Sequence, residues 1–311
     1  MKKNESKSAR QRRKLIYILA PSYTGSTLLT FLLAKHKDIV TIGELKATAR
    51  GDIDAYHCSC GLLQRECSFW KRVTEEMQKT DTDFFLDDFG THFQADSFLC
   101  NRLLRAGIRT GFSEFIRTSM LRMLPSCRRR LFGILERNVQ MIEVICDLQQ
   151  GRLFLDGSKD PIRLKLLDLA GYWDLKVIYL IRDGRGATNS YMRHNNVPME
   201  AAAKEWCSTH LECDRMVQGL KKNMYITIYY EDLCKNPKAT LSKIYDFIGL
   251  SNNSYDIQFN ASEHHILGNQ MRLGSIEGIK LDEKWKSTLT RGDLEIFEQI
   301  AGRFNRSYGY Q

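Results

Sequence analysis

A run of small and hydroxyl-bearing residues near the N-terminus, PSYTGSTLL (residues 21–29), has the composition of a phosphate-binding loop. A helix N-terminus carries unpaired N–H groups and the positive end of the helix dipole, so small residues placed there favour an anion. Gly25 lets the backbone approach the anion. The other candidate ligands are Ser22, Tyr23, Thr24, Ser26 and Thr27. The alternative is that these residues only turn the chain and cap the helix.

The same segment does not match the loop of an ATP-dependent kinase. That loop reads G-x-x-x-x-G-K-[ST], because the lysine reaches the phosphates and the next hydroxyl holds magnesium. Here Ala20 stands in place of the first glycine and Ser26 in place of the lysine. A kinase with a degenerate loop is therefore the less favoured alternative.

A second candidate anion site lies in LIRDGRGATNS (residues 180–190), where Arg182 directly follows an apolar run and Ser190 comes eight residues later. A guanidinium and a hydroxyl bind phosphate through charge-assisted hydrogen bonds. The alternative is a simple ion pair between Arg182 and Asp183.

Both sites follow predicted strands. Buried strands are predicted for the continuous apolar runs at residues 14–20 and 175–182 and for a third run near Tyr225. Amphipathic segments follow the first two runs and predict helices that begin near Ser26 and after residue 186. This alternation predicts an α/β fold with a parallel sheet flanked by helices. Ligands of such sheets bind at the carboxyl ends of the strands, where both sites would lie.

The remaining segments lack comparable strands. Residues 81–150 read as a helical insertion interrupted at Pro125, residues 1–13 as a basic, solvated tail, and residues 252–282 as a long polar loop. The alternative is that this basic tail contacts phosphate or a membrane surface. No linker separates two units, so we expect a single domain over residues 1–311.

Composition narrows the classes of function. The net charge of +9 over 311 residues favours a polyanionic ligand. The clusters RQRRK and CRRR are isolated, which disfavours nucleic-acid binding, and there is no stretch of eighteen apolar residues to span a membrane. Nine irregularly spaced cysteines favour a reducing cytoplasm over a disulfide scaffold. Oligomeric state cannot be predicted from these features.

The two motifs, in this order, resemble those of sulfotransferases that use 3'-phosphoadenosine 5'-phosphosulfate. In that family P-R-S-G-[ST]-[ST] binds the 5'-phosphosulfate, and a strand ending in Arg, with Ser eight residues later, binds the 3'-phosphate. Similar segments are HKDIVTIGEL, SKDP, YEDLCKNPKATLSKIYDFIGL, GNQMR and DEKW. The resemblance implies a P-loop NTPase-like fold and metal-free sulfuryl transfer to a hydroxyl of a carbohydrate, a small metabolite or a tyrosine. The alternative is a non-catalytic nucleotide- or nucleic-acid-binding protein on the same fold.

The resemblance also suggests two catalytic residues. Glu44 occupies a position similar to the glutamate base of tyrosylprotein sulfotransferases, although it could instead cap a helix or pair with Arg50. His36 is a competing base, but it belongs to a helix end. Lys159, before Asp-Pro, resembles the lysine that contacts the sulfuryl oxygens, and its alternative is a surface lysine beside Asp160.

One position departs from the family pattern, and three further positions are candidates for the nucleotide site. Many family members have Arg or Lys where this chain has Tyr23, which offers only a neutral O–H donor. Lys159 and backbone amides then carry the charge, or turnover is slower, or the chain is a catalytically weakened relative. Arg272 and Lys284 are candidate lid cations over the nucleotide, and Tyr230 is expected near the cofactor. The alternative for each is solvated surface.

The segment HCSCGLLQRECSFW (residues 57–70) contains potential metal ligands in His57, Cys58, Cys60 and Cys67. It has no C-x-x-C pair and only one nearby histidine, which is poor spacing for structural zinc. We therefore expect no metal. Similar stretches occur in related bacterial sulfotransferase-like sequences, which suggests that the segment shapes the acceptor side of the pocket. A Cys60–Cys67 disulfide is disfavoured in a reducing compartment.

Overall fold

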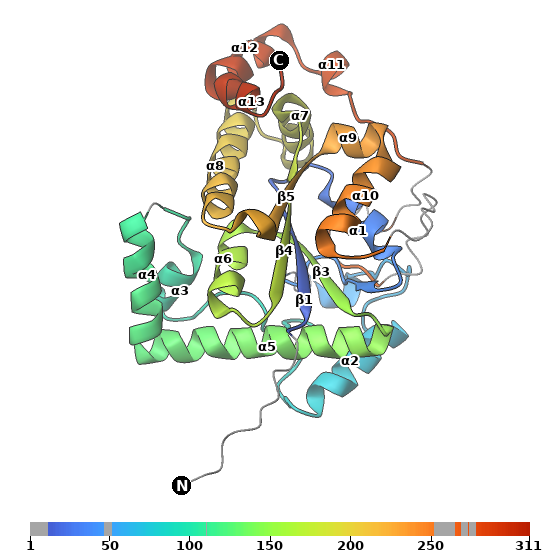
Figure 1. Cartoon of the computed structure of the whole chain (residues 1–311), viewed down its shortest axis with the longest axis vertical. Coiled ribbons are helices and arrows are strands. Elements are labelled where there is room, and N and C mark those ends of the chain that lie inside the picture. Colours follow the sequence, from blue (N-terminus) through green and yellow to red (C-terminus); the bar gives the residue numbers. More distant parts are fainter. Residues whose placement is uncertain (1–11, 47–51, 110, 252–264, 269–272, 274–277) are drawn as a thin grey trace.

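The computed structural model describes residues 12–46, 52–109, 111–251, 265–268, 273 and 278–311. Its centre is a five-stranded parallel sheet in the order β2-β3-β1-β4-β5 (Figure 1). The strands are β1 (Lys14–Leu19), β2 (Ile39–Val40), β3 (Leu153–Lys159), β4 (Asp174–Ile181) and β5 (Tyr225–Tyr229).

Helices cover both faces of the sheet because side chains of a buried strand alternate between the faces. Ile16 and Ile18 of β1 pack toward α1, α9 and α10, whereas Leu15 and Tyr17 pack into the larger core on the side of α5, α6 and α8. These helices are α1 (Ser26–Ala34), α9 (Tyr230–Lys235), α10 (Pro237–Ile248), α5 (Pro125–Gln149), α6 (Pro161–Ala170) and α8 (Met199–Gln218).

Further helices complete the architecture. They are α2 (Ser68–Gln78), α3 (Phe98–Arg105), α4 (Gly111–Met123), α7 (Gly184–Asn195), α11 (Trp285–Thr288), α12 (Arg291–Phe297) and α13 (Arg303–Ser307), and a π-helical turn (Glu298–Gly302) joins the last two. Within the described part of the chain, no helix combines the length and the apolar character needed to cross a bilayer.

The predicted parallel sheet with flanking helices is confirmed, and β1, β4 and β5 lie where the apolar runs placed them. The strand β3, which lies between β2 and β1, was not predicted. Its sequence, LFLDGSK, ends in polar residues, of which Asp156 and Ser158 are fully buried. Periodicity alone cannot identify such a strand, because its polar residues depend on partners elsewhere in the chain.

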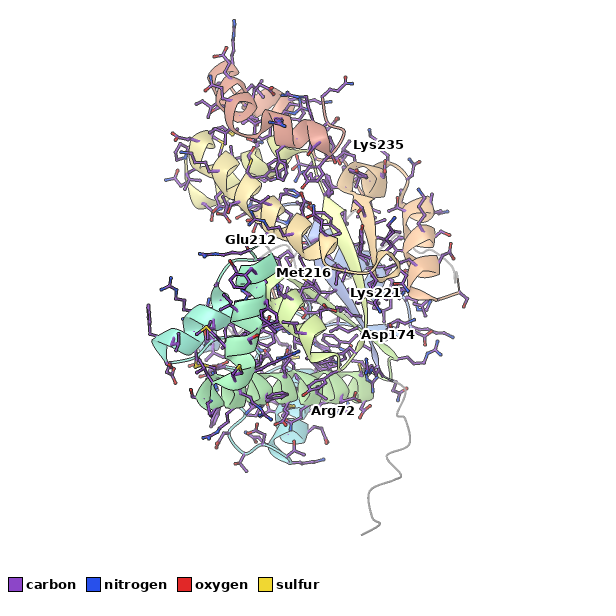
Figure 2. The ribbon with its side chains drawn as sticks, turned by 60° about the vertical axis from the view of Figure 1, so that its left-hand side comes forward. Arg72, Asp174, Glu212, Met216, Lys221 and Lys235 are labelled. Atoms are coloured by element: carbon purple, nitrogen blue, oxygen red, sulfur yellow. A yellow bond between two sulfur atoms is a disulfide. The ribbon has the colours of Figure 1, made fainter. Side chains whose placement is uncertain are left out.

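The range 81–150 contains α3, α4 and α5, and no strand among its described residues; α4 ends just before Pro125. A disulfide joins Cys100 of α3 to Cys127 of α5, which the expectation of a reducing compartment does not predict. The Arg215 guanidinium of α8 donates to the Ile108 carbonyl oxygen at 2.9 Å. Glu212 and Met216, labelled in Figure 2, also belong to α8, and the Glu212 side chain lies next to Gly107 of the range 81–150.

Candidate active site

The first strand–loop–helix corner forms the predicted loop. Tyr23 and Gly25 both adopt left-handed backbone conformations, with φ of 62° and 86°, and the buried Thr24 hydroxyl donates to the Pro21 carbonyl oxygen at 2.8 Å. A Cβ atom on Gly25 would lie 2.4 Å from the Tyr230 ring. Glycine is therefore required here both by the backbone and by the ring above it. The loop delivers the chain to the N-terminus of α1.

Beside this loop, Glu44 and Lys159 are in contact. The Lys159 ammonium lies 2.5 Å from Glu44 Oε1, and the Glu44 side chain is 7% exposed. Both residues line a small, partly open pocket, together with Ser26, Thr27, Thr30, Gly43, Gly157, Ile266, Leu267 and Gly268. The structure thus brings together the predicted phosphate loop, the candidate base and the candidate cation.

Asp160, the alternative partner considered for Lys159, does not pair with that residue. It caps α6 by accepting from the Ile162 and Arg163 amides and lies 3.4 Å from Lys46 Nζ. Although burial opposes ionisation, Lys46 and those amides hold the pKa of Asp160 below its ordinary value. Arg50, the other partner considered for Glu44, lies outside the described residues.

Hydrogen bonds from β3 position the segment around Glu44. The Gly157 amide donates to the Gly43 carbonyl oxygen at 2.8 Å, and the Lys46 amide donates to Ser158 Oγ at 3.1 Å. The Leu45 amide donates to Asp156 Oδ1 at 3.3 Å. This segment therefore continues the alignment of β2 with β3 beyond their two paired positions.

A buried ion pair between Arg163 and Asp156 stabilises the segment around Glu44. Arg163 Nε donates to Asp156 Oδ2 at 2.9 Å, and both side chains are almost fully enclosed. The same guanidinium donates to the Thr91 carbonyl oxygen at 2.8 Å and to Asn138 Oδ1 at 2.5 Å. Thr91 Oγ1 donates to the carbonyl oxygen of Leu45. Sequence reasoning missed this network; a carboxylate inside a buried strand is a signal that a cation must face it.

The second corner joins the first through Arg182. Its Nη1 donates to the Tyr23 carbonyl oxygen at 2.9 Å, and its guanidinium carbon lies 4.6 Å from the centre of the Tyr230 ring. Arg182 does not form the alternative ion pair with Asp183, because Asp183 pairs with Arg185 at 2.6 Å and caps α7. Arg182, a member of the second predicted anion site, thus contacts the loop of the first.

Ser190 lies on α7, and the Tyr23 side chain packs against this helix. Ser190 Oγ, on the second turn of α7, donates to the Gly186 carbonyl oxygen at 3.0 Å. The Tyr23 ring stacks on His194 with 5.0 Å between ring centres, and its hydroxyl accepts from Asn195 Nδ2 at 3.2 Å. The Tyr23 side chain is therefore held against α7.

The later candidates lie around Tyr230. This ring is buried, which raises the pKa of its hydroxyl above the ordinary value, and that hydroxyl accepts from the Asp282 amide at 3.2 Å. Lys284 is exposed, and its amide donates to Asp282 Oδ1. Arg272 lies outside the described residues. The structure thus places Tyr230 next to Gly25 and Arg182.

His36, the competing base, lies elsewhere. Its ring is buried at the end of α1, 5.2 Å from the Tyr245 ring, and Nδ1 accepts from the Asp38 amide. This position agrees with a helix-end role. Ser22 is exposed and lines a second small, partly open pocket between the loop, α7 and α8.

The cysteine-rich segment lies beside the first pocket. The Tyr56 hydroxyl donates to the carbonyl oxygen of Gly268 and accepts from its amide, at 3.1 and 3.0 Å. The sulfur atoms of Cys58, Cys60 and Cys67 gather around His265, which precedes Gly268 by three residues. Sequence reasoning missed His265 because nearly 200 residues separate it from the cysteines.

Comparisons with known proteins agree with this arrangement. A sequence profile of the sulfotransferase family matches residues 16–254, so the chain belongs to that family. This confirms the resemblance drawn from the two motifs and the P-loop NTPase-like fold that it implied. A comparison with curated protein sequences finds no match.

Solved structures share the fold. The sulfotransferase domain from the curacin biosynthetic pathway is 18% identical, with a TM-score of 0.51 over 97% of this chain and 99% of that chain. The sulfotransferase domain of the Synechococcus PCC 7002 olefin synthase is 17% identical, with a TM-score of 0.50 over 96% and 98% of the two chains. STF9 from Mycobacterium avium is 14% identical, with a TM-score of 0.50 over 97% and 78%.

Proposed function

We propose that this protein transfers a sulfuryl group from 3'-phosphoadenosine 5'-phosphosulfate to an acceptor hydroxyl on a carbohydrate, a small metabolite or a tyrosine. The observation that carries the proposal is the 2.5 Å contact between Glu44 and Lys159, in one pocket with Ser26 and Thr27 of the phosphate loop. In-line transfer needs a base for the acceptor and a cation for the leaving oxygen, held beside an anion cradle.

The two residues take separate roles when the donor binds. Lys159 leaves the Glu44 carboxylate and contacts the sulfuryl and bridging oxygens, so that Glu44 accepts the proton of the acceptor hydroxyl. The acceptor oxygen then attacks sulfur, and the bond between sulfur and the bridging phosphate oxygen breaks. The products are the sulfated acceptor and adenosine 3',5'-bisphosphate. Lys159 and loop amides stabilise the departing charge, which Tyr23 cannot do as a neutral residue.

Arg182 holds the 3'-phosphate in this proposal, with Ser190 as a hydroxyl donor. The guanidinium now bonds Asp282, so the phosphate replaces that carboxylate. The remaining proposed nucleotide ligands are Ser22, Tyr23, Thr24, Gly25, Ser26, Thr27, Tyr230, Arg272 and Lys284.

We further propose that residues 1–311 act as one catalytic domain in the cytoplasm, that nucleic acid is not a partner, and that the transfer step itself uses no metal. Seven cysteines without a disulfide partner support a reducing location. A Cys100–Cys127 disulfide detected by alkylation and mass spectrometry of freshly lysed cells would contradict that location.

Thermal unfolding in the presence of each nucleotide tests which nucleotide the protein binds. Adenosine 3',5'-bisphosphate should raise the unfolding temperature, because only a ligand that prefers the folded state stabilises it. Arg182→Ala should abolish the rise, whereas Arg129→Ala, an exposed arginine of α5, should not. Stabilisation by ATP with magnesium but not by the bisphosphate would favour the kinase alternative and contradict the proposal.

Sulfate transfer tests catalysis. Labelled donor is incubated with panels of glycans, phenols, lipids and peptides, and labelled product identifies the acceptor class. A protein that binds the bisphosphate but labels none of these hydroxyl compounds would be the non-catalytic alternative.

A further inference from the structure

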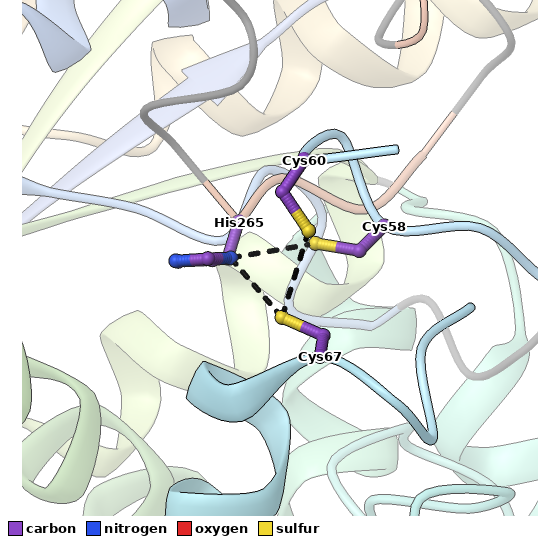
Figure 3. A group of neighbouring side chains, drawn as sticks. All are labelled: Cys58, Cys60, Cys67 and His265. Carbon is purple, nitrogen blue, oxygen red and sulfur yellow. Dashed lines mark hydrogen bonds between the residues drawn. The ribbon is translucent and has the colours of Figure 1, made fainter. Parts of the chain in front are cut away.

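Four metal-ligating side chains converge next to the active site (Figure 3). Cys58, Cys60 and Cys67 come from one segment and His265 from a distant one, and their sulfur and nitrogen atoms all lie within 4.8 Å of one another. Cys60 and Cys67 are 3.7 Å apart between sulfurs, and His265 Nδ1 lies 3.6 Å from Cys58 Sγ and 3.3 Å from Cys67 Sγ.

These separations match the edges of a tetrahedral zinc site. Zinc binds thiolate sulfur at about 2.3 Å and imidazole nitrogen at about 2.0 Å, which places two sulfurs about 3.8 Å apart and sulfur about 3.5 Å from nitrogen. Three thiolates with one imidazole are also a frequent ligand set for structural zinc. We propose that Cys58, Cys60, Cys67 and His265 form a structural zinc site with four protein ligands.

Local backbone geometry builds the cysteine half of the site. Gly61 adopts a left-handed conformation with φ of 88°, and its amide donates to the Cys58 carbonyl oxygen at 2.9 Å, which closes a tight turn around Cys60. The Cys58 amide donates to the Leu62 carbonyl oxygen. Cys67 caps the N-terminus of α2, where the positive end of the helix dipole favours a thiolate.

The histidine is held in place by its own contacts. Its ring stacks on Phe69 with 4.5 Å between centres and an interplanar angle of 5°. The next residue, Ile266, donates its amide to Ser59 Oγ at 2.8 Å. These contacts aim Nδ1 at the sulfurs, as Figure 3 shows.

A divalent cation also fits the chemistry of the buried thiols. Zinc displaces the three thiol protons and accepts a lone pair from the neutral imidazole, which leaves a complex of net charge −1.

The position of the site suggests what the metal does. The Leu267 amide donates to the Ile42 carbonyl oxygen at 2.7 Å, and a Cβ on Gly268 would lie 3.5 Å from Glu44 Oε1. Zinc bound through His265 therefore fastens residues 265–268, which form one wall of the Glu44 pocket, to the segment before α2. This role is structural and is independent of the sulfuryl-transfer step.

Metal content of the full-length protein tests the site. The protein is purified without chelators and without an immobilised-metal column, and zinc is measured by inductively coupled plasma and native mass spectrometry. We expect about one zinc ion per chain. Cys60→Ser and His265→Ala should each weaken zinc binding at least tenfold in competition with a chromophoric chelator. Cys207→Ser, a half-buried cysteine of α8 outside the cluster, should retain zinc.

Two measurements keep the test decisive if a variant folds poorly. His265→Cys should keep the metal, because four cysteines also bind zinc. Cobalt chloride added to the metal-free wild type should give the ligand-field bands of tetrahedral cobalt with thiolate-to-metal charge transfer. Zinc-free protein that takes up no cobalt, a Cys60–Cys67 disulfide in the purified protein, or zinc content unaffected by both ligand variants would overturn the proposal. None of these readouts depends on sulfate transfer.

Discussion

The guanidinium of Arg182 donates to both the carbonyl oxygen and the carboxylate of Asp282, at 3.0 and 3.1 Å. Asp282 is partly buried, and although burial opposes its ionisation, the Lys284 amide and Arg182 hold its pKa below the ordinary value. The carboxylate is therefore an anion bound to the arginine proposed to hold the 3'-phosphate. Donor binding must displace it.

Replacing Asp282 with asparagine should therefore tighten nucleotide binding. A hydrogen bond between charged groups contributes about 1.5–3 kcal/mol, so we expect Asp282→Asn to bind adenosine 3',5'-bisphosphate about tenfold more tightly. Isothermal titration calorimetry measures the change. Glu283→Gln is the matched control, because Glu283 forms an exposed pair with Lys286. Weaker binding by Asp282→Asn would instead mean that the carboxylate organises the nucleotide site.

Removing the charge of Glu44 should separate catalysis from binding. Glu44→Gln keeps the shape of the side chain but cannot accept the acceptor proton, so sulfate transfer should fall by about 100-fold or more. Stabilisation by the bisphosphate should persist. Glu75→Gln, on the exposed face of α2, should preserve both properties. If Glu44→Gln also loses nucleotide binding, then Glu44 acts by positioning Lys159.

The buried pair of Asp156 and Arg163 should matter for stability. Asp156→Asn leaves the Arg163 charge without its buried carboxylate, and breaking such a pair costs about 3–5 kcal/mol. Urea denaturation should show this decrease in the free energy of unfolding. Asp174→Asn, exposed at the start of β4 (Figure 2), should leave the midpoint unchanged. Equal midpoints for wild type and Asp156→Asn would show that the ion pair does not stabilise the fold.

Sequence reasoning located the two strand–helix corners because each consists of a short apolar run followed directly by polar residues. It placed Arg182 correctly for the same reason. Glu44 and Lys159 were identified through family resemblance, and only the tertiary structure shows their contact. Lys159 is the last residue of β3, and Glu44 follows the end of β2 by four residues. Their proximity therefore depends on β2 pairing with β3, a strand that periodicity does not reveal.

The partners that sequence reasoning missed come from chain segments that return to the sheet edge. Asp282 follows Arg182 by 100 residues, and His265 follows Cys67 by 198. Rules for metal sites in a sequence use the spacing of ligands that are close along the chain. With His57 as the only nearby histidine, these rules predict a poor zinc site in the cysteine segment. The structure replaces His57 with His265 as the histidine that faces the sulfurs.

A buried histidine should make stability depend on pH. Burial lowers the pKa of His210 to about 3, and its Nδ1 lies 2.8 Å from the Tyr179 hydroxyl, which itself donates to Asp214. Its Nε2 has no hydrogen-bond partner within the described residues. Protonation would place an uncompensated charge among the rings of Trp206 and Tyr308.

Because the folded state requires neutral His210, its stabilising contribution is complete above the unfolded pKa of about 6.5 and is lost as pH falls toward 3. From pH 6.5 to 5 the wild type should therefore lose about 1.6 kcal/mol more than His210→Phe. Urea unfolding at each pH measures the two slopes. His194→Phe, exposed on α7, should keep the wild-type slope. Parallel slopes for wild type and His210→Phe would show that His210 accepts a proton in the folded state as readily as in the unfolded chain.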